Sequence, residues 1–180
     1  MTADAPLDTR LSPMDPRAAG AASIAFHGLV RLPHITPRAF LPMRAMPEIT
    51  LVAGRGIEGD RDTIGREEAF YSDPAEYGRR TSLLEIETLE ALQRDAGIIP
   101  GSKEHRRNVR VEGVLLNHLV GRRCLLGETW PEATRLSIPC RHIEEMTGKA
   151  IFDPPINRVD VNCHILEGGV VRMGDVVRSL

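Results

Sequence analysis

Residues 135–146 read RLSIPCRHIEEM and predict a sharp corner between a strand and a helix. Apolar and β-branched residues dominate positions 130–138, as in a strand, and the apolar spacing over 141–148 is that of a short helix. Pro139 stands between the two because proline cannot continue a ladder of backbone hydrogen bonds. The corner therefore places Cys140 at the N-terminus of a helix.

A cysteine in this position is favoured as a thiolate. The unpaired backbone N–H groups and the positive end of the helix dipole stabilise negative charge, and Arg141 and His142 add positive charge beside Cys140. Such a thiolate can act as a nucleophile, carry sulfur or bind a soft metal. The competing interpretation is a small, buried and inert side chain, and the local sequence leaves these alternatives open.

The rest of the chain predicts a mainly β fold, because short apolar segments alternate with glycine and proline turns. Strand patterns occur over residues 23–30, 48–53, 122–126, 161–166 and 170–177, and a hairpin turn is expected at 167–169. The sequence SLLE at 82–85 matches a capping box, so Ser82 is expected to cap a helix that Gly97 terminates. Together these signals favour a closed β-barrel with a few short helices at its rim.

Length and composition restrict the class of protein. A chain of 180 residues suits one domain, with residues 1–22, rich in Ala, Pro and Asp, as a flexible or irregular N-terminal segment and 23–180 as a single barrel domain. The net charge of −2 gives no general attraction to nucleic acid or to an anionic membrane. The absence of a disulfide pattern and of a signal or membrane segment predicts a cytoplasmic protein.

The two other cysteines are expected in the core. Cys124 lies in a predicted strand, and Cys163 shares one strand face with two apolar residues. No pair of Cys and His residues has the spacing of a zinc site.

Two segments have the composition of an anion site. GRGIEG at 54–59 matches the dinucleotide fingerprint, but a polar stretch follows it instead of a helix, so a glycine turn is expected. The basic run KEHRRNVR at 103–110 is either a solvated face or a binding edge. In the second case Arg107 would present its fork to a phosphate and Asn108 its amide to a heterocycle.

In their order and spacing, five motifs resemble the MOSC domain. They are GDR at 59–61, RRN at 106–108, the segment 113–123, the Pro-Cys pair at 139–140, and the segment 168–175. This domain occurs in the C-terminal part of molybdenum cofactor sulfurases, in mitochondrial amidoxime-reducing components and in small bacterial stand-alone proteins. The resemblance spans about residues 49–177 and implies a β-barrel related to the barrel domain of pyruvate kinase. The chain departs from the pattern at 155–160, where many relatives carry an Arg-Gly-Gly type of turn.

The resemblance implies a site for the molybdenum cofactor, molybdopterin. Cys140 would be the thiolate ligand of molybdenum or the carrier of a persulfide; Arg61, Arg107 and Asn108 would hold the pterin and its phosphate, with Ser82 beside them. The implied activity is reduction of N-hydroxylated compounds, with electrons from a flavin or iron–sulfur protein, or sulfur transfer, with a cysteine desulfurase as donor. The alternative is a non-catalytic carrier of the cofactor, and the sequence does not separate the two.

Overall fold

The computed structural model describes residues 25–38, 41–64, 77–101, 104–137, 141–151 and 160–179. The predicted N-terminal segment, 1–22, lies outside these residues. The strands are β1 His27–Ile35, β2 Arg44–Ala45, β3 Glu48–Val52, β4 Gly56–Ile57, β5 Thr81–Glu85, β6 Val109–Glu112, β7 Cys124–Leu126, β8 Trp130–Ser137, β9 Asp160–Glu167, β10 Gly169–Arg172 and β11 Val176–Ser179. The helices are α1 Arg61–Ile64, α2 Ile86–Ala96, the 3-10 helix η2 Leu116–Leu119 and α3 Arg141–Thr147.

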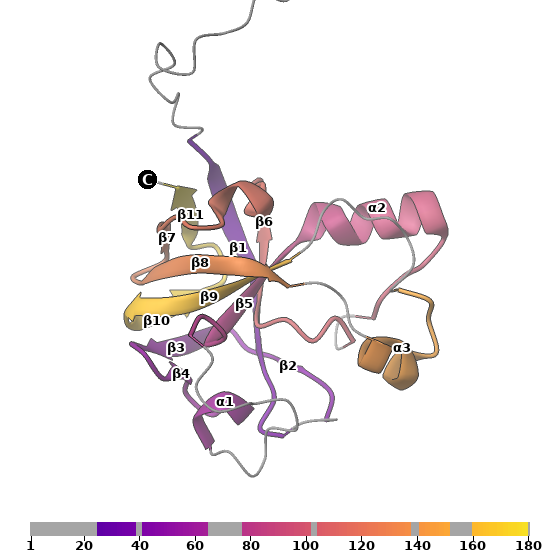
Figure 1. The fold of residues 1–180 in the computed structure, drawn as a ribbon, viewed down its shortest axis with the longest axis horizontal. Helices are drawn as coiled ribbons and strands as arrows, with labels where there is room; N and C mark the ends of the chain where they lie inside the picture. The colour runs from indigo at the N-terminus through magenta and orange to yellow at the C-terminus, as the bar shows by residue number, and fades with distance from the viewer. Residues whose placement is uncertain are drawn as a thin grey trace, which may run out of the picture.

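Seven strands form a nearly closed barrel in the order β7-β11-β1-β6-β5-β9-β8. The two ends of this series approach each other next to β7 and β8. There the backbones of Arg123 and Glu132 form an isolated antiparallel β-bridge, and the Gly121 amide donates to the Ala133 carbonyl at 2.7 Å. Only β5 and β6 pair in parallel among these strands, and α2 supplies the crossover that parallel pairing requires. Figure 1 shows α2 and α3 together on one side of the barrel. The predicted mainly β barrel with a few short helices is confirmed.

The chain passes from the barrel into a three-stranded sheet, β10-β3-β4, at residues 167–169. The expected hairpin at this turn is wrong, since β9 pairs with β5 and β8 whereas β10 pairs with β3. Two glycines allow the change of direction. A Cβ at Gly168 would lie 2.6 Å from the Leu51 carbonyl oxygen, and Gly169 has φ +153.

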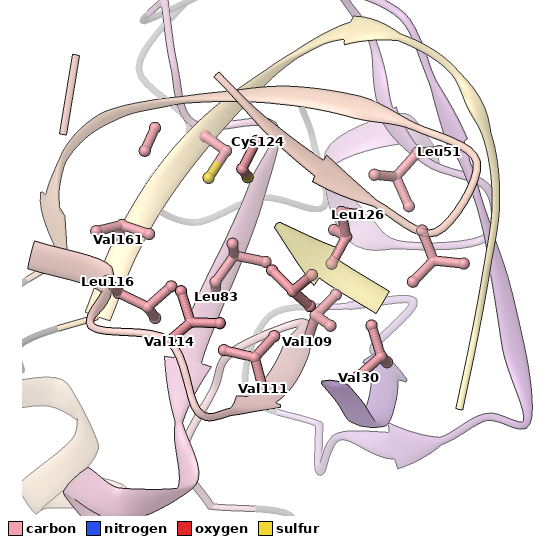
Figure 2. Close-up of a cluster of buried hydrophobic side chains, with 14 of the residues drawn as sticks. Val30, Leu51, Leu83, Val109, Val111, Val114, Leu116, Cys124, Leu126 and Val161 are labelled. Atoms are coloured by element: carbon pink, nitrogen blue, oxygen red, sulfur yellow. The ribbon is translucent and has the colours of Figure 1, made fainter. Parts of the chain in front are cut away.

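The barrel interior is filled by alternate residues of its strands. Figure 2 shows Val30, Leu83, Val109 and Cys124 converging with other apolar side chains. Both Cys124 and Cys163 are fully buried there, which confirms the prediction that they belong to the core. Burial raises the pKa of the Cys124 thiol to about 12 and that of Cys163 well above its ordinary value.

The predicted capping box at 82–85 is wrong. Ser82 lies inside β5, and α2 begins at Ile86 after Glu85, which makes no side-chain cap hydrogen bond. All five residues of β5 are buried between β6 and β9, so ladder pairing and burial outweigh the local capping signal. The predicted stop is confirmed, because Gly97 ends α2 with φ 65.

The segment 54–59 is the glycine turn that its sequence context predicts. Residues 53–55 turn the chain from β3 into β4, the two strands pair antiparallel, and a second turn follows at 58–59. Gly54, Gly56 and Gly59 all have positive φ. No helix among the described residues has the length and apolar character needed to span a membrane.

The first strand is longer than predicted. Residues 23–30 were expected to form it, yet β1 extends from His27 to Ile35, and Pro33 lies within it, opposite Val109. The register between β1 and β6 shifts between Val30 and Leu32, and such an irregularity accommodates a proline within a strand.

Candidate functional site

Ser82 and Asn108 clamp three strands together where β5 and β6 begin. The Asn108 Oδ1 accepts hydrogen bonds from the Ser82 amide at 3.2 Å and from the Ser82 hydroxyl at 2.9 Å. In return, the backbone amide of Asn108 donates to the Ser82 Oγ at 3.1 Å. The side-chain Nδ2 of Asn108 donates to the His34 carbonyl of β1 at 3.5 Å. Because both side chains are buried, this network fixes the backbone of the two strand starts.

Arg107 reaches from the start of β6 to the ends of two other strands. Its Nε donates to the Asp160 carboxylate at the start of β9, and its Nη2 donates to the Ser137 carbonyl at the end of β8 at 2.9 Å. Both side chains of this ion pair are 10% exposed. Burial raises the pKa of Asp160, and the positive charge of Arg107 opposes that rise.

The neighbouring His105 and Arg106 also face inward. The Arg107 amide donates to the His105 Nδ1 at 3.0 Å, and the His105 ring lies edge-on to His34 with centroids 4.7 Å apart. Arg106 has φ 58 and donates to the Leu41 carbonyl. Residues 105–108 are therefore buried, so a solvated face is the wrong interpretation for them. The sequence analysis gave no role to His105, Arg106 or Asp160, although His105 and Arg106 lie in the basic run and Arg106 belongs to the RRN motif.

The backbone of Arg61 is hydrogen-bonded to Thr36, just after β1 ends at Ile35. Its backbone amide donates to the Thr36 carbonyl at 2.8 Å, and the Thr36 amide donates to the buried Asp60 carboxylate at 2.7 Å. Thr36 lies two residues after His34, whose backbone carbonyl accepts the hydrogen bond from the Asn108 side chain. The start of α1, which carries Arg61, is thus tied to the chain just after β1, and the Arg61 side chain is half-buried.

Cys140 lies outside the described residues. The predicted elements on either side of it are confirmed, because β8 ends at Ser137 and α3 begins at Arg141. Ser137, three residues before Cys140, is the acceptor for Arg107. Within the described residues, no group of three or more His, Cys, Asp and Glu side chains is arranged to hold a metal ion.

Solved structures contain the same barrel. YuaD from Bacillus subtilis superposes with a TM-score of 0.69 at 20% identity over 86% of this chain and 96% of that chain. YiiM from Escherichia coli superposes with a TM-score of 0.58 at 15% identity over 84% of this chain and 69% of that chain. Both are MOSC-domain proteins. The fold is MOSC-like. No protein-family model and no curated protein matches the sequence, so the similarity shows the fold alone.

The donor groups at these strand ends would suit an anionic, heterocyclic cofactor. A guanidinium carries five N–H donors, and the contacts of Arg107 with Asp160 and Ser137 use two of them. The Asp160 carboxylate offsets the charge of Arg107, so this side chain would hold a phosphate mainly by directed hydrogen bonds. The Ser82–Asn108 clamp adjoins Arg107 in the chain and fixes the backbone there.

Proposed function

We propose that this protein binds the molybdenum cofactor at the strand ends that carry Ser82, Asn108 and Arg107. The observation that supports the proposal is the convergence of these three residues with Ser137, the last residue of β8 before the Cys140 segment. Arg107 would bind the cofactor phosphate, Asn108 and Ser82 would orient the pterin edge, and Arg61 would add positive charge. Cys140 would be the thiolate ligand of molybdenum, or would carry a persulfide sulfur.

The activity we propose is reduction of N-hydroxylated compounds in the cytoplasm. Bound molybdenum would supply the redox chemistry, and the protein would supply orientation and charge. Electrons would come from a separate protein that carries flavin or an iron–sulfur cluster. In a sulfur-transfer role, Cys140 would instead receive sulfur from a cysteine desulfurase.

The decisive experiment is metal and pterin measurement on protein purified from a host that makes the cofactor. Wild-type protein should retain molybdenum and pterin, whereas Cys140→Ala should lose molybdenum and keep the unfolding temperature of the wild type. Cys140→Ser serves as the size-matched control for loss of the thiolate. Equal molybdenum content in wild type and Cys140→Ala would contradict the ligand role.

Turnover separates the enzyme from the carrier. Loaded protein with a chemical reductant should reduce hydroxylaminopurine under multiple-turnover conditions if it is the enzyme. Transfer of cofactor to a cofactor-free molybdoenzyme without such turnover would favour the carrier.

A further inference from the structure

The ion pair between Arg107 and Asp160 differs from the other ion pairs of the described residues in its burial. Its side chains are 10% exposed, against 47% and 42% for Arg31 and Glu112 and 33% and 34% for Lys149 and Glu104. A buried ion pair is weak support for stability, because desolvation of the two charges offsets their attraction. Stability is therefore a weak explanation for the burial of this pair, and its geometry offers a better one.

The geometry joins three strands through one side chain. Arg107 precedes β6, Asp160 begins β9, and Ser137 ends β8. The Nε and Nη2 groups of one planar guanidinium bind acceptors on two of these strands, so the plane of the fork and its remaining N–H groups have a fixed direction. The Ser137 carbonyl alone would leave the guanidinium free to rotate about that single hydrogen bond.

We propose that Asp160 is a positioning residue of this site: it holds the Arg107 guanidinium against the end of β8 and sets the direction in which Arg107 presents its remaining N–H donors. The role of Asp160 in cofactor retention rests on the proposed function. The contact itself is part of the fold, so it can be measured on protein without cofactor.

The first experiment uses cofactor-free, ¹⁵N-labelled protein. The Arg107 Nε–H group should give a resonance that exchanges slowly with water, because it is buried and bound to a carboxylate; Arg107→Lys identifies this resonance by its loss. Asp160→Asn should shift it and speed its exchange, whereas the control Glu112→Gln, which alters the exposed pair with Arg31, should leave it unchanged. A fast-exchanging Arg107 resonance in the wild type, or an unchanged one in Asp160→Asn, would overturn the proposal.

The second experiment measures pterin bound per protein after expression in a host that makes the cofactor. Asp160→Asn should retain roughly tenfold less pterin than the wild type, as is typical when a group that orients a ligand-binding side chain is lost, and Asp160→Glu should recover part of the loss. A purely structural role would lower the unfolding temperature without this recovery. Equal retention by wild type and a folded Asp160→Asn would overturn the proposal.

A double variant covers the case in which Asp160→Asn does not fold. Arg107→Met with Asp160→Leu removes both charges, so neither is left buried alone, and the barrel should fold. Its pterin retention should be roughly tenfold or more below that of the wild type, because the oriented guanidinium is gone; wild-type retention would overturn the role of the pair. If the wild type itself binds no pterin, the proposed function fails, while the resonance experiment still decides whether Asp160 positions Arg107.

Discussion

Burial determines the chemistry of single residues in this protein. Cys124 and Cys163 lie in the barrel core, and the pKa of each is raised because the apolar interior disfavours the thiolate. Both thiols therefore stay protonated and inert at neutral pH. Cys140 is the one remaining cysteine of the sequence, so the proposed thiolate chemistry depends on it.

The raised pKa of Cys124 predicts a loss of stability in alkaline solution. A thiol in the unfolded chain ionises near pH 8.5, whereas folded Cys124 keeps its proton up to about pH 12. Above pH 8.5 the unfolded state binds one proton fewer than the folded state, so the free energy of unfolding should fall by about 1.4 kcal/mol per pH unit for this thiol. Below about pH 8.5 the contribution of this thiol should be constant. Urea unfolding at several pH values should show a steeper fall for the wild type than for Cys124→Ala. If the free energy of unfolding falls equally with pH in both proteins, Cys124 does not have the raised pKa of a buried thiol.

The hydrogen bonds of the Ser82 hydroxyl predict a loss of stability when this single group is removed. Ser82→Ala leaves the buried Asn108 amide without its acceptor and removes one donor from the Asn108 Oδ1. The free energy of unfolding should fall by about 1 to 3 kcal/mol, measured by chemical denaturation. Ser82→Thr keeps the hydroxyl and should lose less; an equal loss in both variants would show that the hydrogen bonds are not the cause.

At the scale of elements, α2 and α3 form a unit outside the barrel core. Leu92 of α2 packs with Ile143 of α3 and with Ile151, and Leu89 and Ile98 lie against this cluster. Lys149, just after α3, donates to the Ile99 carbonyl at 2.9 Å and pairs with Glu104. These contacts hold the helix that follows the Cys140 segment against the helix that follows β5.

Truncation of this small cluster should release α3 without opening the barrel. Leu92→Ala should increase hydrogen exchange of the α3 amides, while the amides of β5 and β9 keep their protection, because the cluster is separate from the main core. Exchange measured by mass spectrometry tests this, with the exposed Leu136→Ala as the control. A uniform increase over the whole barrel would show that the cluster and the core unfold together.

At the scale of the whole molecule, the barrel depends on the close approach of β1 to β6. A Cβ at Gly28 would lie 2.1 Å from the Glu112 carbonyl oxygen and 2.4 Å from the Val114 Cγ2. Only glycine fits between these two atoms without a shift of the backbone. Gly28 therefore belongs to the packing of the barrel and not to a turn.

Gly28→Ala should consequently destabilise the fold by about 3 kcal/mol or more, because a backbone oxygen cannot move aside as a side chain can. Gly54→Ala provides the control: Gly54 has φ +66 but no atom within 4 Å of the added Cβ, so only backbone strain of about 1 to 2 kcal/mol is expected. Thermal and chemical unfolding of the two variants test the difference. A smaller loss at Gly28 than at Gly54 would contradict the close approach of β1 and β6.

Local patterns in the sequence determined where several strands and helices lie and which strand face is buried. The alternation of Val161, Cys163 and Ile165 predicted the buried face of β9, and Gly97 predicted the end of α2. The strand over 130–138, observed as β8 from Trp130 to Ser137, and the helix after Cys140 were predicted for the same reason. These signals suffice because the period of a strand or helix and the φ of a glycine are properties of a few consecutive residues.

Tertiary structure alone decided which residues meet. Ser82 has the sequence of a helix cap, yet pairing with β6 and β9 places it in a strand against Asn108; Gly168 has the sequence of a hairpin, yet β10 pairs with β3. Asp160, 53 residues from Arg107 in the chain, became part of the candidate site only through the sheet order. The physical reason is that strand pairing and burial of charge are set by contacts between distant segments, whose free energies exceed the local preferences that a sequence pattern reports.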